Sequence, residues 1–81
     1  METIREKKLT FRKEQYIPLH TKVILGVVEK EDGVYLVYSE DLTVKLNIYE
    51  VVLCYAGHLR PTKQVYIGTG RFGNKYAHIF V

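Results

Sequence analysis

The stretch Lys22–Tyr49, KVILGVVEKEDGVYLVYSEDLTVKLNIY, predicts the fold class of this chain. Two apolar runs rich in β-branched residues, 23–28 and 34–38, flank an acidic turn that ends in Asp32-Gly33. An Asp-Gly pair between two such runs is typical of a β-hairpin. Gly26 inside the first run indicates a bulge or a bend. Glycine weakens a regular strand because it has no side chain to pack, so it usually marks an irregularity there.

A third run, residues 42–48, alternates apolar and polar residues. This period of two predicts another strand, so residues 22–49 are expected to form a three-stranded antiparallel meander. The residues expected on its core face are Leu42, Val44, Leu46 and Ile48.

The carboxy-terminal stretch Val65–Val81, VYIGTGRFGNKYAHIFV, predicts a second hairpin. Its apolar runs, 65–67 and 76–81, flank a glycine-rich segment that spans Gly68–Gly73. We expect this segment to be a mobile loop at the hairpin tip, with Phe72 exposed on it.

Two segments have ambiguous patterns. Residues 3–16 fit an alternating strand and also a helix face, and Pro18 after them suits a turn or an edge strand. Asn47 and Glu50 resemble a helix-capping box, whereas the composition of residues 51–55 favours a buried strand. A short helix at about 48–56 is therefore the alternative to a strand there.

The chain has 81 residues, which corresponds to one small domain, 1–81. We predict a mainly β fold, a small antiparallel barrel or sandwich of SH3-like or OB-like size, built on the 22–49 meander and the carboxy-terminal hairpin. The alternative is an α+β fold with the short helix. With so small a core, the chain needs either a partner subunit, as in a homo-oligomer, or an unusually dense β-sheet.

The composition narrows the cellular context. No apolar run reaches the length of about 20 residues that a membrane helix needs, and the first residues lack a signal-peptide core. A single cysteine, Cys54, excludes an internal disulfide framework. A cytoplasmic protein without membrane contact is the expectation.

The charges are segregated along the chain. Residues 58–81 hold four lysines and arginines and no acid, whereas residues 21–57 hold six acids and three lysines. Such an asymmetry favours a polyanionic partner, although a solvated surface with unevenly placed lysines explains it equally well.

Aromatic residues interleave with this acid-free segment, a combination that small β-domains use to stack unpaired bases and follow the phosphate chain. Nucleic-acid binding is therefore the leading hypothesis, and a protein-interaction module that uses a sheet edge or the Phe72 loop is the alternative. The residues expected to bind nucleic acid are Arg60, Lys63, Tyr66, Arg71, Phe72, Lys75 and Tyr76.

The glycines of the hairpin spell G-x-G-x-x-G, at Gly68, Gly70 and Gly73. A dinucleotide-binding fold is excluded because only eight residues follow, they read as a strand, and none is acidic. The remaining interpretations are an anion- or nucleotide-binding loop, assisted by Arg71 and Lys75, and a plain hairpin connection.

The sequence gives little support for metal binding or for catalysis. Cys54 and His58 have the spacing of one zinc-ligand pair, but structural zinc needs a second pair at close spacing. Cys54 lies in an apolar run, which does not suit a catalytic thiolate. We therefore expect no enzyme activity, no metal and no cofactor.

Overall fold

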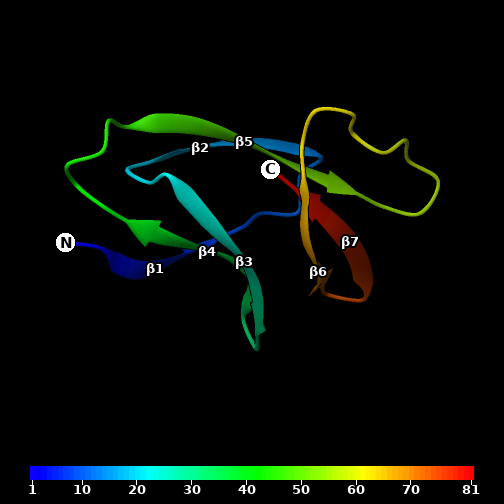
Figure 1. The fold of residues 1–81 in the computed structure, drawn as a ribbon. Helices are drawn as coiled ribbons and strands as arrows, with labels where there is room; N and C mark the ends of the chain where they lie inside the picture. Colours follow the sequence, from blue (N-terminus) through cyan, green and yellow to red (C-terminus); the bar gives the residue numbers. More distant parts are fainter.

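The computed structural model describes residues 1–81 as seven strands without a helix. The strands form two antiparallel sheets, one with the order β1-β4-β3 and one with the order β2-β5-β7-β6, and they do not close into a barrel (Figure 1). The mainly β prediction is confirmed. The strands are β1 (Thr3–Lys8), β2 (Glu14–Leu19), β3 (Val23–Lys30), β4 (Gly33–Glu40), β5 (Asn47–Cys54), β6 (Tyr66–Phe72) and β7 (Lys75–Phe80).

Both predicted hairpins are present. β3 and β4 pair from Val23 opposite Ser39 to Lys30 opposite Gly33, with a register shift that confirms the bulge expected at Gly26. β6 and β7 form the carboxy-terminal hairpin, which also contains a register shift near its start. No helix of the structure has the length and hydrophobicity needed to cross a membrane.

The prediction of a third strand in the 22–49 meander is wrong. Residues 42–46 form a turn and a loop, in which Leu42 and Leu46 are exposed. The cause is local, because the Asp41 carboxylate accepts hydrogen bonds from the Thr43 amide and hydroxyl, and the Asp41 carbonyl accepts one from the Val44 amide. These bonds offer the backbone an alternative to a sheet ladder. β4 pairs with β1 instead.

The segment predicted as a strand or a short helix is strand β5, so the helical alternative is wrong. It pairs with β2 along its length and with β7 at its end. Residues Val51–Cys54 are all buried, since one face of the strand packs into the main core and the other into a smaller apolar cluster. Burial on both faces favours a strand of β-branched residues over an amphipathic helix.

The ambiguous amino-terminal segment resolves into strands β1 and β2, which are joined through the buried Leu9. β1 is exposed along its whole length and forms one edge of the three-stranded sheet. β2 forms an edge of the other sheet, which agrees with Pro18 lying at an edge.

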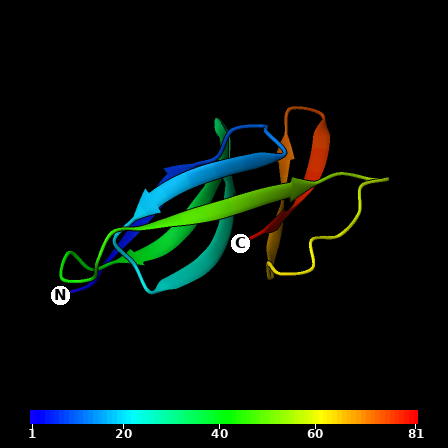
Figure 2. The same ribbon diagram turned by 90° about the horizontal axis from the view of Figure 1, so that it is seen from above.

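The inner sides of the two sheets share one core, and β6 packs directly against the three-stranded sheet. A Cβ atom added at Gly68 would lie 2.4 Å from Val27, and one added at Gly70 would lie 2.6 Å from both γ-carbons of Val34. These glycines therefore permit a backbone approach that any side chain would prevent. β5 extends along the length of the molecule, and the β6–β7 hairpin lies across one end (Figure 2).

Candidate functional site

The outer side of β6 and β7 gathers most of the unusual side chains of the carboxy-terminal segment. The strand register places Tyr66 opposite Phe80, Thr69 opposite His78, and Arg71 opposite Tyr76. Directly paired residues of antiparallel strands project from the same side of a sheet. We call this surface the β6–β7 face, and its members are Tyr66, Thr69, Arg71, Tyr76, His78 and Phe80.

A chain of hydrogen bonds crosses the β6–β7 face. The hydroxyls of Tyr66 and Thr69 lie 2.6 Å apart, and the Thr69 hydroxyl lies 2.8 Å from Nδ1 of His78. The Tyr66 ring also contacts the edge of Phe80, with 5.5 Å between the ring centroids. These contacts hold the exposed Tyr66 ring in one orientation, which lowers the entropy that it would lose on binding a ligand.

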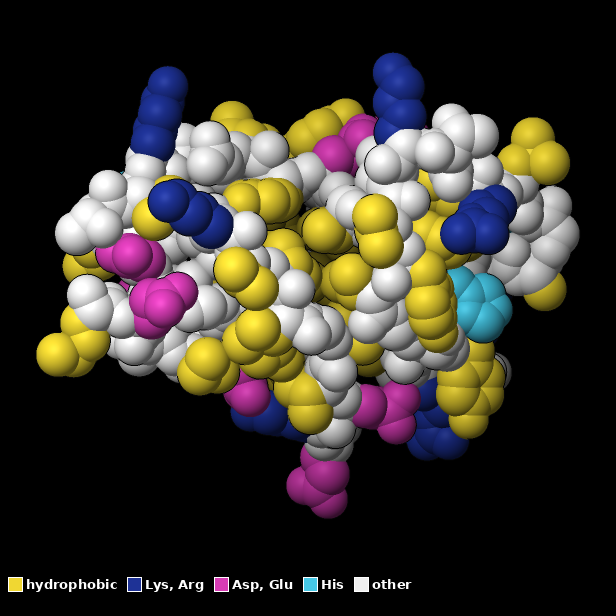
Figure 3. Space-filling model, in the orientation of Figure 1, with side chains coloured by type: hydrophobic (Ala, Val, Ile, Leu, Met, Phe, Trp, Pro, Cys, Tyr) yellow, Lys and Arg dark blue, Asp and Glu magenta, His cyan; other side chains and the backbone are white.

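The segment that follows β5 extends this surface. Arg60 places its guanidinium 5.9 Å from the centroid of the Phe80 ring, and His58 lies against Tyr55 with 4.7 Å between the rings. Figure 3 shows a histidine and a positively charged side chain beside apolar side chains on this side of the molecule. A pocket of about 380 Å³ opens here, and its lining residues are Cys54, Tyr55, His58, Arg60, Tyr66, His78 and Phe80.

The candidate cations are free of ion pairs. All three salt bridges of the structure tie together residues of the three-stranded sheet and its turn, Arg5–Glu40, Lys8–Asp32 and Lys30–Glu6. Arg60, Lys63, Arg71 and Lys75 take part in none of them. A cation without an acidic partner keeps its charge available to a polyanion.

Two acids border the β6–β7 face. Glu29 accepts a hydrogen bond of 2.7 Å from the Arg71 backbone amide, near the hairpin tips. Glu50 accepts one from Gln64 and one of 3.0 Å from the Tyr16 hydroxyl, on the β2–β5 half of the same sheet. The Glu50 carboxylate raises the pKa of Tyr16 through that hydrogen bond and through its charge. The positive surface is therefore narrower than the acid-free sequence suggests.

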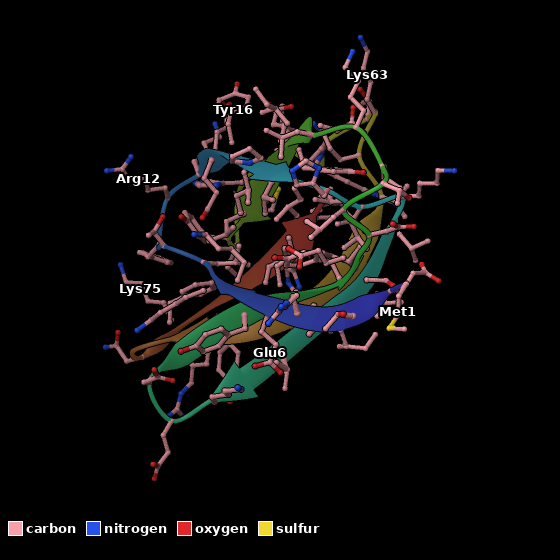
Figure 4. The ribbon with its side chains drawn as sticks, turned by 90° about the vertical axis from the view of Figure 1, so that its left-hand side faces the viewer. Met1, Glu6, Arg12, Tyr16, Lys63 and Lys75 are labelled. Atoms are coloured by element: carbon pink, nitrogen blue, oxygen red, sulfur yellow. The ribbon has the colours of Figure 1, made fainter.

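The structure brings some of the predicted nucleic-acid residues together and separates others. Tyr66, Arg71 and Tyr76 share the β6–β7 face, and Arg60 lies beside it. Figure 4 shows Lys63 and Lys75 projecting from opposite sides of the molecule. The four cations thus do not form one continuous patch.

Phe72 does not lie on an exposed loop tip, so that expectation is wrong. It is the last residue of β6, it is only partly exposed, and it packs against the main core and the Phe11 ring, with 5.4 Å between the two rings. Its partner across the strands is Lys75, on the side opposite to Arg71 and Tyr76. Packing therefore accounts for this phenylalanine.

The glycine-rich loop is also shorter than expected. Gly68 and Gly70 belong to β6, and only Gly73 lies in the two-residue turn, where its φ of 67° suits glycine. The Arg71 amide between them already donates to Glu29. The three glycines consequently do not form one concave loop of free amides.

The structure adds four residues to this surface that the sequence did not predict as nucleic-acid-binding: His58, Thr69, His78 and Phe80. Thr69 and His78 could have been found from the sequence of the turn. A two-residue turn at Gly73-Asn74 sets the register of the hairpin, which pairs Arg71 with Tyr76 and Thr69 with His78. Cys54 is buried and donates to the Leu59 carbonyl. No cluster of three or more histidine, cysteine or acidic side chains is arranged to hold a metal ion.

Comparison with known proteins identifies no relative: no family model, curated protein or solved structure matches this chain.

Proposed function

We propose that this protein binds single-stranded nucleic acid through the β6–β7 face, on an open β scaffold of OB-like or SH3-like size. The observation that carries the proposal is that two exposed tyrosines, Tyr66 and Tyr76, share one side of the β6–β7 hairpin with Arg71, and that Arg60 lies beside them over the Phe80 ring. Aromatic rings on a sheet stack unpaired bases, and adjacent cations follow the phosphate chain.

The spacing of the two tyrosines supports stacking of more than one base. Tyr66 lies opposite Phe80 and Tyr76 lies opposite Arg71. The two tyrosine positions are therefore separated by four residues along β7, about 13 Å at the rise of a strand. Each ring would stack a separate base, with Arg71 beside Tyr76 and Arg60 beside the Phe80 end.

A single strand suits the β6–β7 face better than a duplex does. Stacking on tyrosine requires a base whose face is free, which a paired and stacked duplex does not offer. Reading a duplex through its grooves requires a protruding helix or ribbon with polar side chains aimed at base edges. The residues of this face are instead aromatic and cationic.

The test is fluorescence anisotropy with labelled single-stranded DNA and RNA 12-mers over a series of salt concentrations. Tyr66→Leu and Tyr76→Leu should each weaken binding about 5- to 150-fold, because stacking contributes roughly 1–3 kcal/mol per base. Tyr16→Leu is the matched control, since Tyr16 and Tyr76 are both 63% exposed but Tyr16 lies beside Glu50.

The same assay tests how much the positive charges contribute to binding. Arg71→Gln should make the salt dependence of the binding constant shallower by about 0.7 in log–log slope, the contribution of one contact to a single strand. Lys45→Gln removes the same charge from the exposed 42–46 loop and should leave the slope unchanged. No binding at low salt, or equal losses in variants and controls, would refute the proposed function.

A further inference from the structure

The outer side of the three-stranded sheet carries a group of exposed aliphatic side chains. The register aligns Ile4, Ser39 and Val23 in one row across the sheet, and Glu6, Val37 and Gly26 in the next. Ile4 is 62% exposed and Leu25, the extra residue of the bulge, is 51% exposed. We call this surface the aliphatic face, and it consists of Ile4, Val23, Leu25, Val28 and Val37.

Two ion pairs within the chain border the aliphatic face. Lys30 forms an ion pair with Glu6 and lies over the Tyr35 ring, 4.8 Å from its centroid. Lys8 lies 3.9 Å from Asp32, whose other partner is the Tyr35 hydroxyl. Both ion pairs are neutral, and Glu2, which accepts a hydrogen bond from the Ser39 hydroxyl, adds one negative charge beside Ile4. Two identical surfaces would therefore meet with little net charge on each.

The view in Figure 3 has the arrangement of an interface. Hydrophobic side chains gather over the middle of this view, around β3 and toward β6, and both basic and acidic side chains stand toward its outline. An apolar centre with a polar rim is the usual anatomy of a protein–protein contact. Contiguous exposed apolar patches that exceed several hundred square ångströms often mark such a contact.

The chain exposes more surface than a compact monomer of its mass. Its accessible surface is 5668 Å², against about 5,050 Å² expected for a monomer of this mass. Its radius of gyration is 12.6 Å, against about 11.7 Å for a typical domain of this length. A dimer would cover part of this excess of about 600 Å², and each partner of a standard interface contributes roughly 800 Å².

We propose that two copies of this chain form a dimer by stacking their aliphatic faces, with one three-stranded sheet on the other. Such an isologous contact needs a self-complementary patch, which an apolar centre bordered by internal ion pairs provides. Side chains of two stacked sheets interdigitate across about 10 Å. Pairing through the β1 edge is disfavoured, because Arg5, Glu6, Lys7 and Lys8 occupy that strand.

The test is the molar mass of the full chain in solution, measured by sedimentation equilibrium from low to high micromolar concentration. The wild-type chain should approach about 19 kDa, twice the 9.5 kDa of one chain. Leu25→Lys and Ile4→Lys, on opposite edges of the aliphatic face, should each return the mass to that of one chain. Leu42→Lys is the matched control in the 42–46 loop and should leave the dimer intact.

Circular dichroism of each variant establishes that the strands remain folded. If Leu25→Lys unfolds the chain, Val23→Thr is the milder substitution at the same face, and it should raise the dissociation constant at least several-fold. A wild-type chain that stays monomeric throughout, or a dimer that persists in folded aliphatic-face variants, would overturn the proposal.

Discussion

The Thr69 hydroxyl lies 2.8 Å from Nδ1 of His78 on the neighbouring strand. The same hydroxyl lies 2.6 Å from the phenol of Tyr66. One small side chain therefore connects an aromatic ring of β6 to an imidazole of β7. This connection fixes the geometry of the surface to which we assign nucleic-acid binding.

Replacing Thr69 by valine should loosen that surface without changing its shape. Thr69→Val removes both hydrogen bonds of the hydroxyl, so the Tyr66 ring is held only by its contacts with Phe80 and His78. We expect single-strand binding to weaken about 3- to 10-fold and the free energy of unfolding to fall by about 0.5–1.5 kcal/mol. Anisotropy and urea unfolding measure the two effects, and Thr3→Val on exposed β1 is the control. An unchanged affinity would show that the hydroxyl does not orient the ring for binding.

The close approach of β6 to β4 predicts a steric coupling. Gly70→Ala places a Cβ 2.6 Å from both γ-carbons of Val34, so it should destabilise the fold by about 1–3 kcal/mol. Val34→Ala removes those carbons, and the double variant should therefore be more stable than the sum of the two single losses predicts. Urea unfolding of all four proteins measures the coupling. Strictly additive losses would contradict the packing of these two strands.

The Asp41 turn predicts a dependence of stability on pH. Hydrogen bonds from the Thr43 hydroxyl and then the Thr43 amide hold the pKa of Asp41 below its ordinary value of 3.8. A pKa lowered in the folded state means that the stabilisation is present above the ordinary value and is lost as the pH falls through the folded one. Thr43→Val should lower the free energy of unfolding at pH 7, and the difference from wild type should shrink at pH 3. A constant difference would contradict this account.

Removing the negative charge of Glu29 should strengthen nucleic-acid binding. Its carboxylate accepts from the Arg71 amide at the border of the β6–β7 face, where its charge opposes a phosphate chain. Glu29→Gln keeps an accepting oxygen and removes the charge, so binding at low salt should tighten about 2- to 3-fold and the gain should vanish at high salt. Glu40→Gln removes a charge that faces Arg5 instead and serves as the control. Equal effects of the two substitutions would show that Glu29 does not border the binding surface.

The parts of the fold that depend on neighbouring residues could be predicted from the sequence. The β3–β4 hairpin follows from two β-branched runs around a short acidic turn, and the bulge at Gly26 follows from a glycine in a strand. Leu42–Ile48 has an equally regular alternation, yet Asp41 turns the chain and Leu42 is exposed. Alternation alone cannot show whether a covering surface exists.

The remaining elements depend on partners far away in the sequence. Strand β5 is fixed by burial between β2 and β7, which overrides the helix-capping pattern of Asn47 and Glu50. Similarly, Tyr66 and Tyr76 could be named as candidate binding residues from the sequence, whereas placing His78 beside them required the strand register and placing Phe72 required knowledge of the core. The spacing of the three glycines predicted a loop at the hairpin tip. The close approach of Gly68 to Val27 and of Gly70 to Val34 explains better why two of these positions are glycine.

The most direct measurement of the central claim is a titration of the isotopically labelled chain with a single-stranded 12-mer, followed by amide chemical shifts. We predict that the shifts concentrate in β6, in β7 and around Arg60, that they grow smaller with added salt, and that the amides of β1 and β4 stay unchanged. Shifts centred on the three-stranded sheet, or no shifts at low salt, would contradict the assignment of the β6–β7 face.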